Sequence, residues 1–160
     1  MIASKIIAAF AMWISASGIF GTAAYASNDP VPLWVYHSST VYGNMGQCAI
    51  TLSFDSQTQS VRGLNLKLVA VGKDGAVRAR GDVTVPDFGE SEATRYVDAH
   101  WGHAALCEDN LQLRIEQARG KVLGSSFDLI ARQLLEVDEF KPMPISIGKG
   151  VPTTKKPAKK

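Results

Sequence analysis

The chain has 160 residues and a formal net charge of +2, from 17 basic and 15 acidic side chains. This length fits one domain with a single hydrophobic core, and the small net charge does not indicate a nucleic acid as partner. Beyond the N-terminal segment, no stretch is apolar for long enough to span a membrane, so no integral membrane segment is expected.

Residues 1–26 predict a secretory signal peptide. Lys5 precedes a nearly continuous apolar run over 6–20, and Ala24-Tyr25-Ala26 places small residues at both positions that signal peptidase reads. The run is shorter than the ~20 apolar residues of a membrane span, which favours cleavage after Ala26 over a membrane anchor. The mature protein is therefore expected to be secreted or periplasmic.

The charge is unevenly distributed along the mature chain. Every acidic residue lies at or before Glu139, while five lysines crowd the end: Lys149, Lys155, Lys156, Lys159 and Lys160. Residues 27–149 are expected to form the folded domain. Residues 150–160 predict a disordered basic tail, because Gly, Pro, Thr and Lys cannot bury apolar area. The tail charge could attract anionic lipid, polysaccharide or nucleic acid, but a solvated tail is commoner.

Cys48 and Cys107 are the only cysteines, and in an exported protein they predict one disulfide. Closing a loop of about 60 residues would stabilise the fold by about 4 kcal/mol in the chain-entropy model. Two free thiols or a redox pair are the alternatives, but the spacing is unlike Cys-x-x-Cys, and two cysteines are too few for a structural zinc site without histidines.

The first half of the mature chain reads as short strands. Residues 33–36 predict a strand, followed by a polar stretch at 37–40 and a turn at 43–46. Alternate residues from Cys48 to Phe54 are apolar, which predicts a half-buried strand. Residues 61–71 and 77–85 predict a hairpin whose turn contains Asp74-Gly75, and Gly81 indicates a bulge or a change of facing residues.

The second half predicts strands at 93–101, 111–115 and 140–147. Residues 127–137 have helical spacing, although a strand followed by a turn is equally compatible. Six or seven short strands separated by turns predict an all-β, two-sheet sandwich of immunoglobulin or fibronectin type III kind. An exposed edge strand could pair with another chain or swap with a second copy, so a strand-swapped homodimer is one possibility.

No motif predicts catalysis. His100 and His103 are the nearest approach to a metal pair, and they have no convincing third ligand. The chain has no Gly-x-Ser-x-Gly elbow, phosphate loop or dinucleotide fingerprint. Glu108-Asp109 reads as a loop before a strand. We therefore expect a protein that is not an enzyme and uses neither a cofactor nor a metal.

Aromatic residues are the best candidates for recognition. Trp34, Tyr36, Tyr42 and Trp101 are the candidate binding residues, concentrated in the first strand and before Cys107. Most should pack in the core, as one tryptophan does beside the disulfide of many sandwiches. One or two exposed ones would serve as interface anchors.

Several segments of the chain together carry a resemblance to a known family. They are HSSTVY at 37–42 with GQC at 46–48, FGESEATRY at 88–96, CEDNL at 107–111 and PISIGK at 144–149. Together they resemble the interleukin receptor mimic protein A family, small secreted proteins of uropathogenic and other enteric bacteria. The similarity extends from about Trp34 to Lys149.

The resemblance implies a fibronectin III-like sandwich with one disulfide, a domain-swapped dimer, and binding of host cytokines in immune modulation and virulence. It carries over no individual binding residue, and the basic tail departs from the family pattern. An alternative therefore remains: a periplasmic structural or assembly factor that binds a bacterial envelope partner through an exposed edge strand. Protein in the culture medium would favour the first function, and retention in the periplasm the second.

Overall fold

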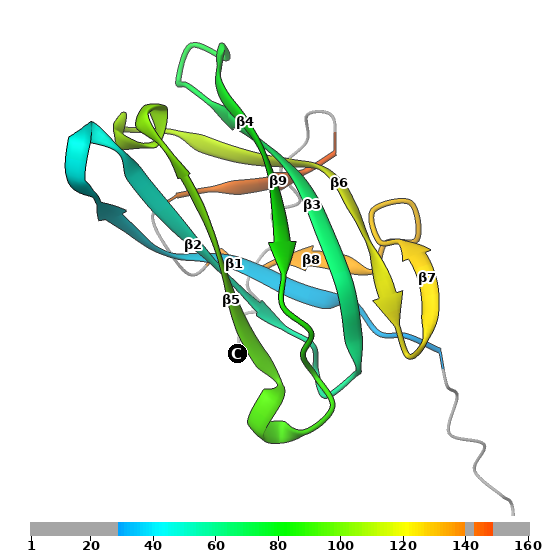
Figure 1. The fold of residues 1–160 in the computed structure, drawn as a ribbon. Helices are drawn as coiled ribbons and strands as arrows, with labels where there is room; N and C mark the ends of the chain where they lie inside the picture. Colours follow the sequence, from blue (N-terminus) through cyan, green and yellow to red (C-terminus); the bar gives the residue numbers. More distant parts are fainter. Residues whose placement is uncertain (1–28, 140–142, 149–160) are drawn as a thin grey trace, which may run out of the picture.

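The computed structural model describes residues 29–139 and 143–148, which form strands and short 3-10 turns (Figure 1). The predicted signal peptide and basic tail lie outside the described residues, as does the beginning of the predicted strand at 140–147. Among the described residues, no helix is long and apolar enough to cross a membrane. The strands are β1 (Leu33–Tyr42), β2 (Cys48–Asp55), β3 (Val61–Val71), β4 (Val77–Val85), β5 (Tyr96–His103), β6 (Gln112–Val122), β7 (Ser125–Asp128), β8 (Leu135–Val137) and β9 (Ile145–Ile147).

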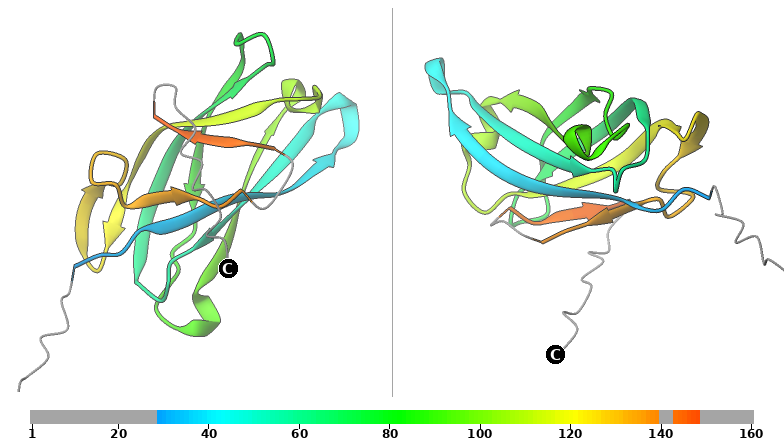
Figure 2. Two further views of the ribbon diagram at one scale, coloured as in Figure 1. Left: turned by 180° about the vertical axis from the view of Figure 1, so that it is seen from behind. Right: turned by 90° about the horizontal axis from the view of Figure 1, so that it is seen from below.

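The strands form two sheets, which confirms the predicted β-sandwich (Figure 2). Sheet A has the order β5-β2-β1-β8, and sheet B has the order β4-β3-β6-β7, with β9 also paired to β6. Most neighbours are antiparallel. The exceptions are β8, which is parallel to β1, and β9, which is parallel to β6. β3 pairs with one edge of β6. Both β7 and β9 therefore pair with the opposite edge of β6.

Alternate residues of each long strand fill the space between the sheets. The core residues of β2 and β3 on this side are at most 1% exposed, and they are Cys48, Ile50, Leu52, Phe54, Val61, Leu64, Leu66, Leu68 and Ala70. Leu113 and Ile115 of β6 join them, as their alternation with polar residues predicted. The residues between them point toward the outer faces of the sheets, where Thr51, Ser53 and Val69 are nevertheless buried by their neighbours.

The structure corrects two local predictions and decides between the two alternatives of a third. β1 continues through the polar stretch at 37–40, because a bulge between His37 and Ser39 keeps it paired with β2. The predicted strand at 93–101 begins only at Tyr96, since Glu92–Thr94 forms a 3-10 turn (η2) with a Ser91–Thr94 capping box. Residues 127–137 adopt the strand-plus-turn alternative, as the end of β7 and all of β8.

Gly81 does not mark a bulge, because the register shift of β4 lies between Val77 and Ala79. The absence of a side chain serves the packing of the two sheets instead. A Cβ at position 81 would overlap atoms Nε1 and Cε2 of the Trp101 ring, which comes from β5 of the opposite sheet. Gly81 thus provides the space into which a 7% exposed tryptophan fits.

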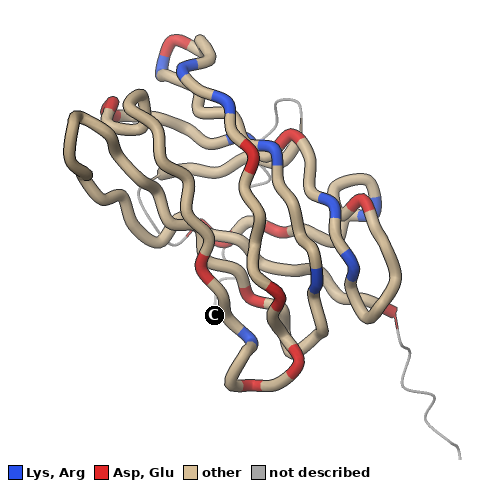
Figure 3. The backbone as a smooth tube through the Cα atoms, viewed as in Figure 1, with Lys and Arg blue, Asp and Glu red and all other residues tan. Residues whose placement is uncertain are grey.

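The strands of the two sheets differ in the charged residues that they carry (Figure 3). The strands of sheet A carry Asp55, Asp98 and Glu136, and no lysine or arginine. In the part of the chain that the structure describes, only three basic residues, Lys73, Arg95 and Arg132, lie outside the strands of sheet B. Sheet B carries Arg62, Lys67, Arg78, Arg80, Arg114, Arg119 and Lys121, against Asp82, Glu116 and Asp128.

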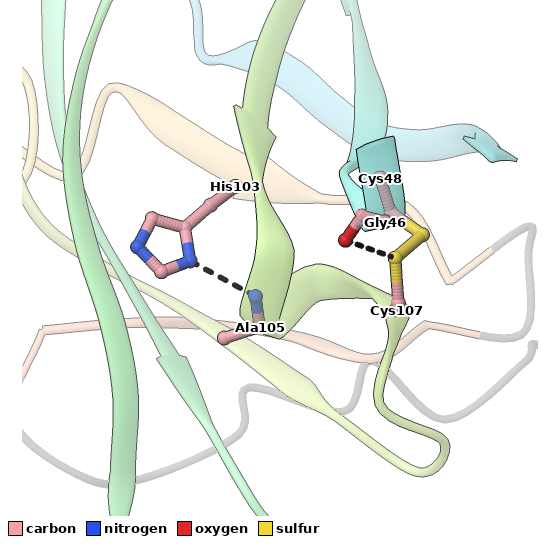
Figure 4. The surroundings of a disulfide bond; sticks show 5 residues. All are labelled: Gly46, Cys48, His103, Ala105 and Cys107. Carbon is pink, nitrogen blue, oxygen red and sulfur yellow. Dashed lines mark hydrogen bonds between the residues drawn. A yellow bond between two sulfur atoms is a disulfide. The ribbon is translucent and has the colours of Figure 1, made fainter. Parts of the chain in front are cut away.

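The predicted disulfide joins Cys48 to Cys107, with 5.2 Å between their Cα atoms (Figure 4). Cys48 starts β2, and Cys107 ends the 3-10 turn Ala104–Cys107 (η3), through which the chain passes from sheet A to sheet B. Within this turn, the Ala105 N–H donates to His103 Nδ1. The disulfide therefore fastens the crossover segment to the first residue of β2, an inner strand of sheet A.

We predict that removal of this disulfide lowers the free energy of unfolding by about 2–5 kcal/mol, because the 59-residue separation leaves a long loop open in the unfolded chain. Urea denaturation with and without a thiol reductant measures the change. Cys48→Ala/Cys107→Ala is the control, since its stability should not respond to the reductant. Equal stability of the oxidised and reduced protein would contradict the prediction.

We predict that Gly81→Ala destabilises the fold by about 1–3 kcal/mol, because the new methyl group overlaps Trp101 in a close-packed layer. Gly102→Ala is a matched control on β5, where a Cβ would meet only the Cys48 carbonyl oxygen, at 3.9 Å. Its free energy of unfolding should change by less than about 0.5 kcal/mol. Equal effects of the two substitutions in urea denaturation would show that the space beside Trp101 is unimportant.

Candidate binding site on the outer face of sheet A

Strand pairing brings together side chains that are far apart in the sequence. Trp34 of β1 lies opposite Asp55 of β2, and Asp55 lies opposite Tyr96 of β5. On the other side of Trp34, the neighbour across the sheet is Glu136 of β8. One row of four residues therefore crosses the outer face of sheet A from edge to edge.

Arg95, which directly precedes β5, forms an ion pair with Asp55 of this row. Arg95 Nε and one terminal nitrogen each lie 2.7 Å from a different Asp55 oxygen, so the contact is bidentate. The Arg95 guanidinium also lies 5.1 Å from the centre of the Tyr96 ring. The short turn η2, which ends just before Arg95, directs the arginine onto the sheet. The Arg95 guanidinium is therefore held between the Asp55 carboxylate and the Tyr96 ring.

The ion pair changes the acidity of Asp55. Partial burial acts to raise the pKa of the Asp55 carboxyl, but hydrogen bonds from Arg95 and from the Gln57 N–H outweigh it and hold the pKa below its usual value. Asp55 also raises the pKa of Arg95 above its usual value, by accepting its hydrogen bonds. Both groups are therefore charged throughout the physiological range.

A shallow hollow of about 500 Å³ lies over this row. Its lining combines aromatic rings with carboxylates: Trp34, Tyr36, Asp55, Gln57, Arg95, Tyr96 and Asp138. Trp34 and Tyr36 are partly exposed, and Tyr96 is 58% exposed. Trp, Tyr and Arg are the residues most enriched at the energetic centres of protein–protein interfaces. The chemistry of the hollow is that of a contact surface.

The rest of the face is polar and internally hydrogen-bonded. Ser53 Oγ donates to Asp98 at 2.5 Å, and Thr51 Oγ1 lies 3.1 Å from His100 Nδ1. His103 lies beyond them and accepts the hydrogen bond that caps η3. Within residues 29–139 and 143–148, no three His, Cys, Asp or Glu side chains are grouped to hold a metal ion.

The structure separates the four candidate aromatic residues. Trp34 and Tyr36 lie together in the hollow. Tyr42 is 72% exposed at the far end of β1, beside the exposed Met45. Trp101 points into the core against Gly81, so it is not available to a partner.

Five residues of the hollow were not among the candidates: Asp55, Gln57, Arg95, Tyr96 and Asp138. In the sequence, Tyr96 and Arg95 fall in the predicted strand at 93–101, and Asp55 follows the predicted strand that begins at Cys48, so none of the three stands out as a site residue. The pairing of Asp55 with Arg95 spans 40 positions. Only the sheet register brings these residues together, and no local sequence signal indicates it.

The fold and disulfide define this protein as a disulfide-linked β-sandwich with an aromatic and acidic outer face. The family model for interleukin receptor mimic protein A matches residues 33–137. The chain therefore belongs to the interleukin receptor mimic protein A family. Among solved structures it is similar to IrmA from Escherichia coli, with a TM-score of 0.58 and 20% identity over 70% of this chain and 95% of that one. No curated protein matches it.

We predict that Asp55→Asn lowers the stability of the protein at neutral pH and that its difference from the unsubstituted protein shrinks on acidification. A carboxyl whose folded pKa is depressed stabilises the fold above its unfolded pKa of about 4, and this stabilisation is lost as the pH falls through the folded pKa. Urea midpoints measured between about pH 7 and pH 3 test this prediction.

Glu92→Gln is the control for this series. The Glu92 carboxylate lies 3.9 Å from Arg95 and is 78% exposed, so its pair should contribute little at any pH. A loss of stability in Asp55→Asn that does not vary with pH would contradict the role of the ion pair.

Proposed function

We propose that this protein is a secreted, non-enzymatic, dimeric binding module that captures a host cytokine through the outer face of sheet A. The observation that carries the proposal is the hollow in which Trp34, Tyr36 and Tyr96 surround the Arg95–Asp55 pair. Membership of the interleukin receptor mimic protein A family supports a cytokine as the ligand. The disulfide supports export, because such bonds persist in oxidising compartments.

The proposed surface has the properties of an interface centre. Its rings are partly exposed and rest on strands of a packed sheet, so little conformational entropy is lost when a partner binds. The Arg95 guanidinium is already held by Asp55 and Tyr96, which prepares it to contact a partner. These features favour a protein ligand over a small molecule, which would need a more enclosed pocket.

Charge indicates the kind of protein surface that fits. Arg95 neutralises Asp55, so the excess negative charge of this face comes from Asp98 and Glu136 on the strands and from Asp138 beside the hollow. A partner with a basic contact surface would be attracted to this face, and such attraction accelerates association at low salt. The cytokine contact is therefore expected to include lysine or arginine side chains.

The first experiment combines size-exclusion chromatography and light scattering on the oxidised protein, alone and mixed with a panel of cytokines. We expect a dimer that co-elutes with at least one cytokine. A monomer that binds no cytokine and is retained in the periplasm would overturn the proposal and favour an envelope role.

The binding surface is located by substitution. We predict that Trp34→Ala and Tyr96→Ala each weaken cytokine affinity at least about tenfold, as expected for aromatic residues at an interface centre. Tyr42→Ala is the matched control, because it removes a 72% exposed ring from the same strand as Trp34 but at its other end. Titration calorimetry measures the affinities. A loss confined to Tyr42→Ala would move the binding surface to the β1–β2 hairpin.

A further inference from the structure

β5 ends sheet A on the side of the sandwich where β4 ends sheet B (Figure 1). The Trp101 ring of β5 lies against Gly81 of β4 and separates the two strands, so they do not pair. In the part of the chain that the structure describes, β2 is the only strand paired with β5. The other edge of β5 is therefore open to a further strand.

Every second residue of β5 directs its backbone N–H and C=O groups toward this open edge. The Ser56 N–H donates to the Arg95 carbonyl oxygen at 3.0 Å, just before β5 begins. Residues of an antiparallel ladder alternate between those that bond to the neighbouring strand and those that do not. Counting from Arg95, every second residue bonds to β2, and the residues between them face the open edge. These residues are all exposed, and they are Tyr96, Asp98, His100 and Gly102.

β5 lacks most of the features that protect the other sheet edges. β4 has a register shift and carries three charged residues, Arg78, Arg80 and Asp82. β7, β8 and β9 are only three or four residues long. Bulges, charges and short strands are the usual means by which proteins keep an edge from pairing with another chain. β5 instead keeps one register with β2 over eight residues and carries a single charged residue, Asp98.

Gly102 gives independent support for a contact at this edge. A glycine inside a strand weakens the strand, and it often marks a place where another backbone or a ligand approaches closely. No described part of the chain requires this glycine. Its φ lies outside the left-handed region, and a Cβ would meet only the Cys48 carbonyl oxygen, at 3.9 Å. An aromatic side chain on an added strand could cover Gly102 and stabilise the pairing.

Asp98 determines the charge of a segment that fits the edge. Its hydrogen-bond partner, Ser53 Oγ, is neutral and leaves the negative charge uncompensated. Opposite charges at paired positions of neighbouring strands are stabilising, and like charges are destabilising. A lysine or arginine beside Asp98 is therefore favoured. Because Asp98 and Gly102 are four positions apart on one face, the basic and the aromatic residue of the added strand have the same separation.

We propose that the open edge of β5 binds an extended segment of a partner protein, which pairs with it as an additional strand of sheet A. The segment carries a basic residue beside Asp98 and an aromatic residue beside Gly102. Its alternate residues reach the margin of the core beside Val97, so they are apolar. The contact rests on backbone hydrogen bonds at the edge of the sheet, and it does not require Trp34 or the binding of a cytokine.

The test uses protein produced from the complete coding sequence, with its disulfide formed, and synthetic peptides of the same length as β5. The first peptide alternates valine with threonine, and phenylalanine and lysine replace two threonines at the required separation. Residue-resolved amide hydrogen exchange locates the contact. We expect the Asp98 and His100 N–H groups to exchange fast in the free protein and at least about tenfold more slowly at saturating peptide. A peptide whose donors toward β5 are N-methylated should not bind.

Charge reversal tests the recognition of the segment. Asp98→Lys should weaken binding of the lysine peptide at least about fivefold and strengthen binding of a peptide with glutamate in place of lysine. Asp82→Lys makes the same change on β4 and should alter either affinity less than about twofold. Trp34→Ala should also leave peptide affinity within about twofold, even if it abolishes cytokine binding, so the two proposals can fail separately.

Three results would overturn the proposal. The first is an equal effect of the Asp98 and Asp82 substitutions. The second is peptide binding that leaves exchange at Asp98 and His100 unchanged. The third is slow exchange of these two amides in the free protein, together with a dimer in light scattering, because a second copy of the chain would then occupy the edge.

Discussion

Packing between the two sheets constrains every long strand of this protein. The core is one layer of mainly aliphatic side chains, and each strand can supply only every second residue to it. Trp101 is the largest ring in this layer, and it fits because Gly81 of the opposite strand has no side chain. The inward positions are therefore fixed by volume. The outward positions are less constrained, and the two sheets differ there in charge and in aromatic content.

Much of the sandwich could be predicted from the sequence, because alternation is a local property. The inward residues of β2, the β3–β4 hairpin and the disulfide all follow from short segments and from the number of cysteines. The role of Gly81 could not be predicted, since it depends on a ring that meets it from the other sheet. The pairing of the short parallel strands β8 and β9 could not be predicted either, because three residues are too few to show a periodic pattern.

The candidate site was predictable only in part. Trp34 and Tyr36 are two positions apart on one strand, so they share a face whenever that strand forms. Tyr96 and Asp55 share a face because β5 pairs with β2 in one register, and a shift of one residue would place them on opposite faces. Arg95 reaches Asp55 because it directly precedes this strand.

The last described segment also affects how the molecule folds. β8 adds to sheet A and β9 adds to sheet B, so the C-terminal part of the chain crosses from one sheet to the other. Leu33, at the start of β1, pairs with Leu135, near the other end of the domain. Contacts between such distant residues slow folding, because a large loop must close before they form. During synthesis from the N-terminus, the edge of β1 that pairs with β8 therefore stays open until residues 135–137 have emerged.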